Sequence, residues 1–568
     1  MVSGYEDTPE KQEPAPVRSG QRGDRRNEVE LLEAFRQCRR SGDNNLLQFC
    51  QDHSVPESTM RYWLSRQESA DAPAGWVELV ESPDGLALLH EIVTAATFVI
   101  TQELGGGYRP VSRFLELSGL WRVVGAGYGT QFESVKAMEE AIVEFGGEER
   151  ERLADQMAPK SITVAEDETF HGSQPCLVAI EPVSNFIILE EYAPDRRAET
   201  WDDAMASALE GMPVKVFQST GDEAKALLKH ARESLDAHHS PDLFHPQQDI
   251  SRATSLPLER QIKAAAKAAD DAQQRHDALV EEAETYEAQR VGPGRPRDYA
   301  SRIQEVSDEV ERANGRVEEA EARRRQVRDA ARAISAVYHP FDLETGEERD
   351  SARAETELEA QFAIIEEAAD EAKLTIKCRE LLNKAHRIVP QMVATIALIH
   401  TLIRVKVEAL GLAEDAEDVV LDRLVPALYL DEAAKKASTA EQRSDLRNRA
   451  EELRAPRDRA DDPLSRLDDG ERSAVHDVAL ECAQLFQRSS SCVEGRNGVL
   501  ALRRHSLHRL TPRKLAAFTV VHNYATTRAD GTTAAGRFFG RRPRDLFAYL
   551  LVRLPPPARP AANRVTFH

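Results

Sequence analysis

The sequence predicts a multidomain α+β protein whose small strand-containing core is split by a large all-helical insertion. Its 568 residues are too many for one hydrophobic core, so several domains are expected. Short apolar runs of strand length are confined to residues 161–218. More than two hundred residues with helical periodicity then follow before a basic C-terminal part.

Composition narrows the class of protein further. The chain has a net charge of −23 and 30% charged residues. Its most hydrophobic run, residues 86–100, is short and contains His90 and Glu91, so we expect a buried helix there and no membrane partner. The six cysteines form no CxxC pair, which favours a reducing cytosol over a zinc site.

The first 70 residues predict a disordered tail over 1–26 and a helical DNA-binding domain over 27–70. The tail is polar and lacks an apolar signal core, so no export is expected. Helices are expected at Glu28 to Arg40, at Asn44 to Asp52 and from Glu57 onward. This order resembles the helix-turn-helix of transposase and repressor N-termini, in which the last helix enters the major groove. An ordinary three-helix bundle is the alternative. The third helix would expose Ser58, Arg61, Tyr62 and Arg66 to DNA.

Residues 71–158 predict a second helical domain, for DNA binding or dimerisation. Ser82 followed by Pro83 is typical of a helix start, and that helix should run to about Leu104. Gly105-Gly-Gly107 then ends it. Because this glycine run lacks the GK[ST] of a phosphate-binding loop, no nucleotide cofactor is expected.

Residues 159–256 predict the first part of an RNase H-like α/β core. Apolar strands are expected at 161–167, 176–180, 186–190 and 214–218, with helices at 199–209 and from Glu223. This β-β-β-α-β-α order is the opening of an RNase H-like fold. Asp167 ends the first strand, and Asp222 follows the fourth after a short turn.

Residues 257–470 predict the helical insertion. Apolar and small residues recur at alternating spacings of four and three from Leu258 to Leu279 and from Ile303 to Val327. Gly292-Pro-Gly-Arg-Pro296 separates the two runs, so we expect an antiparallel coiled-coil hairpin. Further helices are expected at 351–371, 376–410 and 415–453.

Residues 471–545 predict the second part of the core, and 546–568 a basic tail. Glu494 lies in Ser489-Ser-Ser-Cys-Val-Glu494, where the basic segment begins. From Gly495 to His568 there are fourteen Lys and Arg residues and only two acidic ones. This asymmetry favours a surface that meets phosphates, with Arg496, Arg503 and Arg504 as candidate contacts. A solvated helix face is the alternative for these arginines.

Asp167, Asp222 and Glu494 together predict a site for two metal ions. Carboxylates bind hard divalent cations, and paired cations stabilise the attacking and leaving oxygens of phosphoryl transfer. We therefore expect two Mg²⁺ ions, with Mn²⁺ able to substitute. Glu166 adjoins Asp167, and strand alternation turns only one of the two toward the site.

With these residues in hand, the chain resembles a DDE transposase of a bacterial insertion sequence. Asp167, Asp222 and Glu494 match the catalytic acids of that family. Asp242-Leu-Phe-His245 is similar to the [C/D]xxH motif of transposases with large helical insertions, such as the hAT type. Val493-Glu494-Gly-Arg-Asn497-Gly498 resembles the glutamate motif of a bacterial group with a long insertion. Asp242, His245 and Asn497 would be supporting residues, with His245 positioning Asp242, touching DNA or simply packing.

The resemblance implies cleavage and strand transfer of DNA. The expected partners are double-stranded transposon terminal repeats and target DNA, bound by a homodimer or higher oligomer in the bacterial cytoplasm, associated with the nucleoid. The main alternative is a domesticated, catalytically silent DNA-binding protein that keeps the fold. A structural coiled-coil protein and an RNase H-like nuclease without strand transfer are further alternatives.

Overall fold

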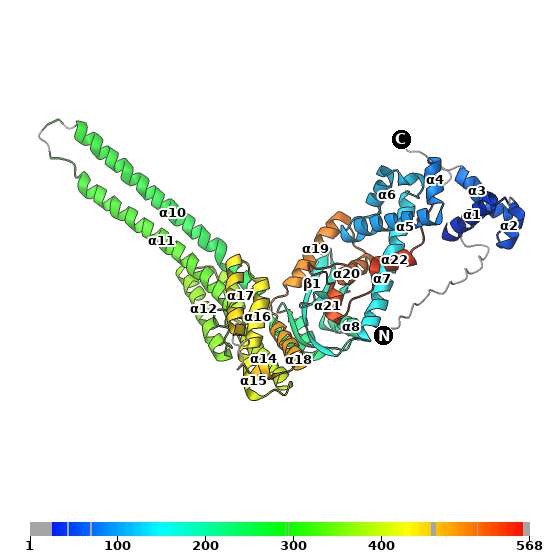
Figure 1. Ribbon diagram of the computed structural model, residues 1–568. Coiled ribbons are helices and arrows are strands. Elements are labelled where there is room, and N and C mark those ends of the chain that lie inside the picture. The colour runs from blue at the N-terminus through cyan, green and yellow to red at the C-terminus, as the bar shows by residue number, and fades with distance from the viewer. Residues whose placement is uncertain are drawn as a thin grey trace. The chain divides into compact units, whose positions relative to one another are not determined.

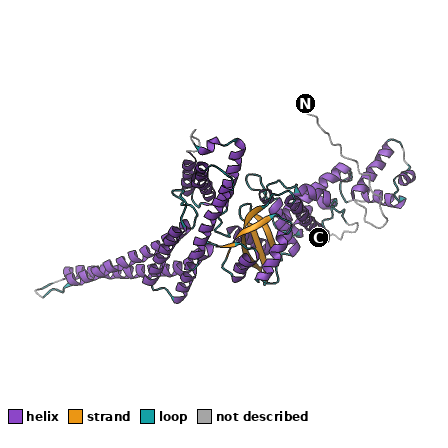
Figure 2. Ribbon diagram, turned by 90° about the horizontal axis from the view of Figure 1, so that it is seen from below, coloured by secondary structure: helices purple, strands orange, loops and turns teal. Residues whose placement is uncertain are grey.

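The chain forms two compact units in a computed structural model, which describes residues 25–42, 45–68, 71–289, 291–292, 295–455, 462–507 and 509–560 (Figures 1 and 2). The terminal unit comprises the residues up to 158, Glu190–Tyr192 and those from 497 onward. The central unit comprises residues 159–189 and 193–496. Most described residues are helical, and one five-stranded sheet is present among them, so the predicted multidomain α+β class is confirmed.

The terminal unit begins with three helices at the predicted positions. They are α1 (Arg25–Arg40), α2 (Leu46–Asp52) and α3 (Glu57–Glu68). Leu32, Phe35, Phe49 and Met60 are buried between them, as expected for apolar residues spaced on one face of each helix. A tail was predicted for residues 1–26, and residues 1–24 of it lie outside the described residues. Its last two residues open α1, and Arg25 forms a buried ion pair with Glu81 at 3.0 Å.

A second group of helices in the terminal unit packs around the long helix α7 (Tyr128–Ala154). The predicted start at Ser82 is present, because its hydroxyl accepts a hydrogen bond from the Gly85 N–H at 3.2 Å. The remaining elements of this group are α4 (Ala74–Val80), α5 (Pro83–Phe98), the π-helix η1 (Val99–Glu103), α6 (Tyr108–Leu117), η2 (Leu120–Arg122), α20 (Pro512–Tyr524), α21 (Ala534–Phe539) and α22 (Leu546–Arg553).

Helix α22 corrects the predicted C-terminal tail. Residues 546–553 were expected to belong to a basic tail, but Leu546 and Leu550 are buried on one face of a helix. Arg553 at the end of this helix pairs with Glu144 of α7 at 2.7 Å. The apolar run Leu546 to Val552 therefore packs as an amphipathic helix, and its basic residue serves that packing. Residues 561–568 of the predicted tail lie outside the described residues.

The sheet has the strand order β3-β2-β1-β4-β5. Strand β1 (Lys160–His171) pairs antiparallel with β2 (Gln174–Glu181) and parallel with β4 (Val214–Gly221). Strand β3 (Phe186–Tyr192) lies at one edge, and β5 (His238–Pro241) pairs parallel with β4 at the other. Residues 162–166 of β1 are buried, as expected for a central strand covered on both faces. Figure 2 shows the sheet against helices of the chain.

Helix α8 (Ala198–Leu209) connects β3 to β4, and a short helical segment connects β4 to β5. That segment is α9 (Lys225–Lys229) followed by the π-helix η3 (His230–Ser234). The sequence had predicted four of the five strands. It missed β5 because its four residues, His-His-Ser-Pro, carry no apolar alternation.

The predicted hairpin is formed by α10 (Phe244–Gln289) and α11 (Tyr299–Val337), which lie side by side in Figure 1. Its expected small-residue seam is buried, with Ala269 and Ala272 of α10 against Ala313 of α11. Helix α10 begins earlier than expected, because Pro246 lies in its first turn and Pro257 is accommodated inside it.

The rest of the insertion is a helical bundle. The helix expected over 376–410 is interrupted at Arg387 and Ile388, because Pro390 restricts the residues before it. Its elements are α12 (Ser351–Glu371), α13 (Ile376–His386), α14 (Val389–Glu408), α15 (Glu414–Val419), the π-helix η4 (Val420–Leu424), α16 (Val425–Lys436), α17 (Ala440–Arg454), η6 (Pro463–Arg466) and α18 (Asp469–Gln484).

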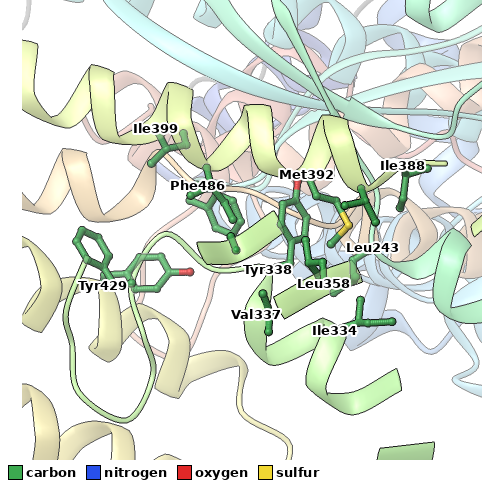
Figure 3. Packing of buried hydrophobic residues seen from close by; sticks show 14 of the residues in the cluster. Leu243, Ile334, Val337, Tyr338, Leu358, Ile388, Met392, Ile399, Tyr429 and Phe486 are labelled. Atoms are coloured by element: carbon green, nitrogen blue, oxygen red, sulfur yellow. The ribbon is translucent and has the colours of Figure 1, made fainter. Parts of the chain in front are cut away.

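The main core of the central unit joins this bundle to the base of the hairpin. Figure 3 shows Tyr338 and Phe486 packed near Leu243 and Met392, and the two aromatic ring centroids are 5.2 Å apart. Leu243 immediately follows the loop after β5, and Phe486 lies shortly before Glu494 in the sequence. This core therefore fixes the two segments that lead into the predicted site.

Two helical stretches, Pro83–Glu103 and Ile376–Glu408, have the length and apolar composition of a membrane-spanning helix. In these stretches 50% and 44% of the apolar window is buried inside the protein. His90 of the first stretch donates or accepts a hydrogen bond with the Leu551 carbonyl at 3.0 Å. About half of each apolar window is therefore covered by other parts of the protein.

Candidate active site

Asp167 and Asp222 lie at neighbouring positions of the central strand pair. Strands β1 and β4 run parallel with Ala165 level with Thr220. The same register, continued by two residues, sets Asp222 beside Asp167. Both side chains are partly buried, and the Asp222 carboxylate accepts a hydrogen bond from the Ala224 N–H at 3.0 Å, which fixes the turn after β4.

Glu166 and Asp167 face opposite sides of the sheet. Glu166 is fully buried, accepts a hydrogen bond from the Ser219 hydroxyl and lies 3.3 Å from His230 Nε2. The pKa of His230 is raised by Glu166 and Asp202, against the effect of burial. Because Glu166 is engaged with these groups on one face, strand alternation leaves Asp167 on the other.

Gly221 allows the two strands to approach at the site. A Cβ atom at this position would lie 2.7 Å from the Glu166 carbonyl oxygen, closer than such atoms can approach. Any larger residue would push the end of β4 away from β1 and displace Asp222 with it. Gly221 falls in the short turn that was expected between the fourth strand and Asp222, whereas β4 extends to include it.

Asp242 connects the end of β4 to the helix that carries Glu494. Its N–H donates to the Gly221 carbonyl at 3.2 Å, and its buried carboxylate accepts hydrogen bonds from the Ser490 hydroxyl and the Phe244 N–H. Ser490 in turn precedes α19 (Ser491–Leu507), and its carbonyl accepts the Glu494 N–H at 3.2 Å. Asp242 therefore positions the first turn of α19, where Glu494 lies.

The electrostatics place Asp167, Asp222 and Glu494 in one acidic site. Burial and the carboxylates of Glu168, Asp222 and Glu494 together raise the pKa of Asp167 to about 7, against the hydrogen bond that it accepts from the Glu168 N–H. Burial also raises the pKa of Glu494, as does Asp242, whereas His245 lowers it. Asp222 and Glu494 are therefore near enough to Asp167 to act on its carboxyl group.

His245 lies at the margin of the same site. Its Nε2 is 3.9 Å from the Asp242 carboxylate, and its side chain remains 37% exposed. His245 is therefore neither enclosed in the core nor in hydrogen-bond contact with Asp242. Glu168 is held differently, because its carboxylate pairs with Arg196 at 2.7 Å.

The donor set suits a hard cation, although the carboxylates do not form a closed ligand cage. Among the described residues, no three His, Cys, Asp or Glu side chains are gathered closely enough to hold one ion. Asp167, Asp222 and Glu494 supply oxygen atoms alone, which Mg²⁺ prefers, and Mg²⁺ usually completes its shell with water and phosphate oxygens. Carboxylates spread around two ions and a phosphate fit this arrangement.

The residues predicted to contact DNA in α3 lie on its outer surface. Ser58, Arg61 and Tyr62 are exposed, and Arg66 is partly exposed. Arg61 pairs with Glu57 at 2.6 Å, and the Arg66 guanidinium lies 5.9 Å from the centre of the Tyr62 ring. These contacts hold the side chains along one face of the helix.

The predicted phosphate contacts after Glu494 differ from one another. Arg496 is buried, with 7% of its surface exposed, so its side chain is not presented to a ligand in this conformation. Arg503 lies 4.0 Å from the centre of the Phe518 ring and donates to the Glu103 carbonyl at 3.3 Å, which indicates a packing role. Arg504 and Asn497 are partly buried.

Sequence reasoning missed Arg488. This residue is partly buried and forms no ion pair with the described carboxylates, and its guanidinium donates to the carbonyls of Ser335 and Tyr338 at the end of α11. Its own carbonyl accepts the Leu243 N–H at 3.0 Å. Arg488 thus ties the base of the hairpin to both segments of the site. A single arginine before a serine run gives no signal of this in the sequence.

The comparisons with known proteins give one match. Residues 420–566 match the model of a family of unknown function (DUF6399). The match includes Glu494 and the basic segment but covers less than half of the chain. The family has no assigned activity, so the match does not indicate one for this chain. No curated protein and no solved structure matches the chain.

Proposed function

We propose that the chain is a DDE transposase that cleaves and transfers DNA strands through Asp167, Asp222 and Glu494. The sheet supports an RNase H-like core for this enzyme. Its order β3-β2-β1-β4-β5, with β2 antiparallel and β4 and β5 parallel to β1, is the arrangement that such a core requires. The core would be interrupted between β5 and α19 by the helical insertion.

The observation that carries the proposal is the convergence of the three acids. The helical insertion lies between Asp222 and Glu494 in the sequence, yet both of these residues raise the pKa of Asp167. Gathering like charges costs stability, and clusters of perturbed carboxylates are typical of functional sites. A structural coiled-coil protein would have no use for this arrangement.

The two metal ions would be held by Asp167, Asp222 and Glu494. Their positive charge would stabilise the attacking and leaving oxygens of a phosphodiester. Asp167 must lose its proton to serve as a ligand, and its raised pKa places that step near neutral pH. Asp242 keeps Glu494 at the site through Ser490 and the start of α19. His245 lies where it can orient Asp242 or contact the DNA backbone.

The N-terminal helices are proposed to bind double-stranded DNA. In this reading α3 is the second helix of a helix-turn-helix and presents Ser58, Arg61 and Tyr62 to the major groove. The proposed ligands are the terminal repeats of the element that encodes the chain. Association with the nucleoid would follow from this binding.

The test is Mg²⁺-dependent cleavage of DNA that carries the sequences flanking the gene. Wild-type protein is compared with Glu494→Gln, which keeps the size of the side chain and removes its charge. Glu210→Gln serves as the matched control, because Glu210 is exposed and lies at the end of α8 away from the three acids. We expect a 3′-hydroxyl product from wild type and the control, and a loss of at least about a thousandfold in the Glu494 variant.

Two outcomes would argue against the proposal. Specific binding of the flanking DNA without cleavage in Mg²⁺ or Mn²⁺ would favour a catalytically silent DNA-binding protein. Cleavage that survives in Glu494→Gln would show that the three acids are not the active site.

A further inference from the structure

An open pocket lies in the central unit where the sheet meets the helical insertion. Its volume is about 430 Å³, within the range of small-ligand sites. Arg232 of η3 and the two histidines of β5, His238 and His239, line one side. Arg387, which follows α13, and Gln391, in the first turn of α14, line the other. The three acids take no part in this lining.

The two arginines of the pocket form no close ion pair with a carboxylate that the structure describes, although the charge of Arg232 acts on the nearby Glu223 carboxylate. Among the described residues, neither Arg232 nor Arg387 has a carboxylate within 4.0 Å, although most other arginines of the central unit form such pairs. Both side chains are exposed at the pocket. The first turn of α14, a helix of 20 residues, adds the partial positive charge of a helix N-terminus.

His239 is the second feature of a binding site. It is buried, with 4% of its surface exposed, and neither ring nitrogen has a hydrogen-bond partner within the described parts of the chain. Its closest carboxylate oxygen, from Glu223, is 3.9 Å from Nε2. A buried polar group without a partner costs stability, so an imidazole that lines a pocket in this state indicates a missing ligand.

The histidine is also held as a neutral donor. Burial, together with the neighbouring Arg232 and His238, lowers the pKa of His239 to about 4. Neutral imidazole can still donate one N–H to an acceptor. His238 is fixed beside it by a hydrogen bond between its Nε2 and the Thr395 hydroxyl at 2.9 Å.

We propose that this pocket binds a phosphate group through Arg232, Arg387 and His239. Two guanidinium groups offer forked donors that match the oxygens of a phosphate, and the imidazole adds a third donor from the buried wall. The pocket has room for more than the phosphate, so the ligand is a phosphate ester. Its source is either a free nucleotide or the backbone of DNA. The inference does not depend on the proposed activity of the three acids.

The test measures binding to the full chain at constant ionic strength. The probes are inorganic phosphate, a nucleoside 5′-monophosphate and a short DNA duplex. The variant is Arg232→Gln with Arg387→Gln, and the matched control is Arg328→Gln with Arg332→Gln, which removes two exposed charges from α11. All four arginines are exposed, so both variants should fold, and their unfolding temperatures check this.

We expect the pocket variant to lose at least about tenfold in affinity for the phosphate probe and the control to lose none. An effect on both small probes identifies a free phosphate ester. An effect on the duplex alone, with the salt slope reduced by about two, identifies a DNA phosphate. If the pocket variant and the control bind all three probes equally, or if none binds to wild type, the proposal is wrong.

The pKa of His239 provides a second test, because a phosphate bound only to surface charges would leave it unchanged. An anion bound against the imidazole favours its protonated form, so saturation with the phosphate probe should raise the pKa of His239 from about 4. NMR titration of a histidine-labelled protein measures this directly. An unchanged titration at saturating probe would contradict the role of His239.

Discussion

At the residue scale, Asp167 makes the stability of the protein depend on pH. Its pKa is about 7 in the folded chain and 3.8 for an ordinary aspartate. Between these values the folded state holds a proton that the unfolded state releases. The contribution of Asp167 to the free energy of unfolding therefore falls as pH rises from about 4 to about 7 and stays low above that range.

Replacing Asp167 with Asn should remove this effect. In metal-free buffer at pH 8 we expect Asp167→Asn to be more stable than wild type, by on the order of 2 kcal/mol after allowance for partial exposure to water. Near pH 4 the two proteins should be equally stable. Chemical denaturation at both pH values measures this. A variant that is less stable than wild type at pH 8 would mean that the carboxylate stabilises the metal-free fold.

Asp242 and Ser490 provide a second prediction at this scale. Because both act on Glu494 through one hydrogen bond, Asp242→Ala and Ser490→Ala should each reduce the rate of DNA cleavage, by about tenfold or more. The double variant should lose little beyond the larger single loss. If the variants lower kcat and leave KM unchanged, Asp242 and Ser490 act by positioning Glu494. Strictly additive losses would show that the two residues act separately.

At the scale of elements, Arg488 connects the hairpin to the site. It caps the end of α11 through the carbonyls of Ser335 and Tyr338, and Leu243 donates to its own carbonyl. Arg488→Met should lower the free energy of unfolding by about 3 kcal/mol, since it leaves buried carbonyls unpaired. Arg488→Lys should recover part of this loss, because lysine keeps a donor but not the fork.

The measurement is urea denaturation of the three proteins, followed by the cleavage assay at a temperature where all are folded. If Arg488 also positions Glu494, Arg488→Met will cleave more slowly even when folded. Full activity in the folded variant would limit Arg488 to a structural role.

Helix α3 carries the prediction on DNA binding. Arg61 is exposed on its outer face and pairs only with Glu57 among the described residues, so Arg61→Gln should disturb the fold little. If α3 enters the groove, this variant should weaken duplex binding, and the slope of affinity against salt should fall by about one if Arg61 contacts a phosphate. Arg113→Gln, on α6, is a matched control with a similar exposed ion pair. Equal binding by both variants would exclude α3 as the reading helix.

At the scale of the whole molecule, the sequence predicted the elements better than their packing. The hairpin followed directly from the spacing of Ala269, Ala272 and Ala313, because a repeat of 3.5 residues places these side chains on one seam. The prediction for the two aspartates was right in part: β4 ends just before Asp222, whereas β1 does not end at Asp167 as expected but continues to His171. The helices of the hairpin and the strands near the two aspartates could be predicted because each depends on the spacing of apolar residues along one short segment.

The parts that escaped prediction depend on contacts between distant segments. Strand β5 forms because β4 is available to pair with it, and the sequence His238-His-Ser-Pro241 has no alternation of apolar residues that would indicate a strand. Arg496 is buried and Arg488 caps α11, although both arginines read as surface charges in the sequence. The pocket between Arg232 and Arg387 joins residues more than 150 positions apart. Such long-range packing leaves no periodic trace.

The most direct test of the central claim is strand transfer by the three acids. Wild-type protein is incubated in Mg²⁺ with pre-cleaved end DNA bearing a 3′-hydroxyl and with a supercoiled plasmid, beside Asp167→Asn, Asp222→Asn and Glu494→Gln. We expect joined end–plasmid DNA from wild type and from the Glu210→Gln control, and none from the three variants. Joined product from any of the three variants would contradict a shared active site, and its absence from wild type would contradict strand transfer itself.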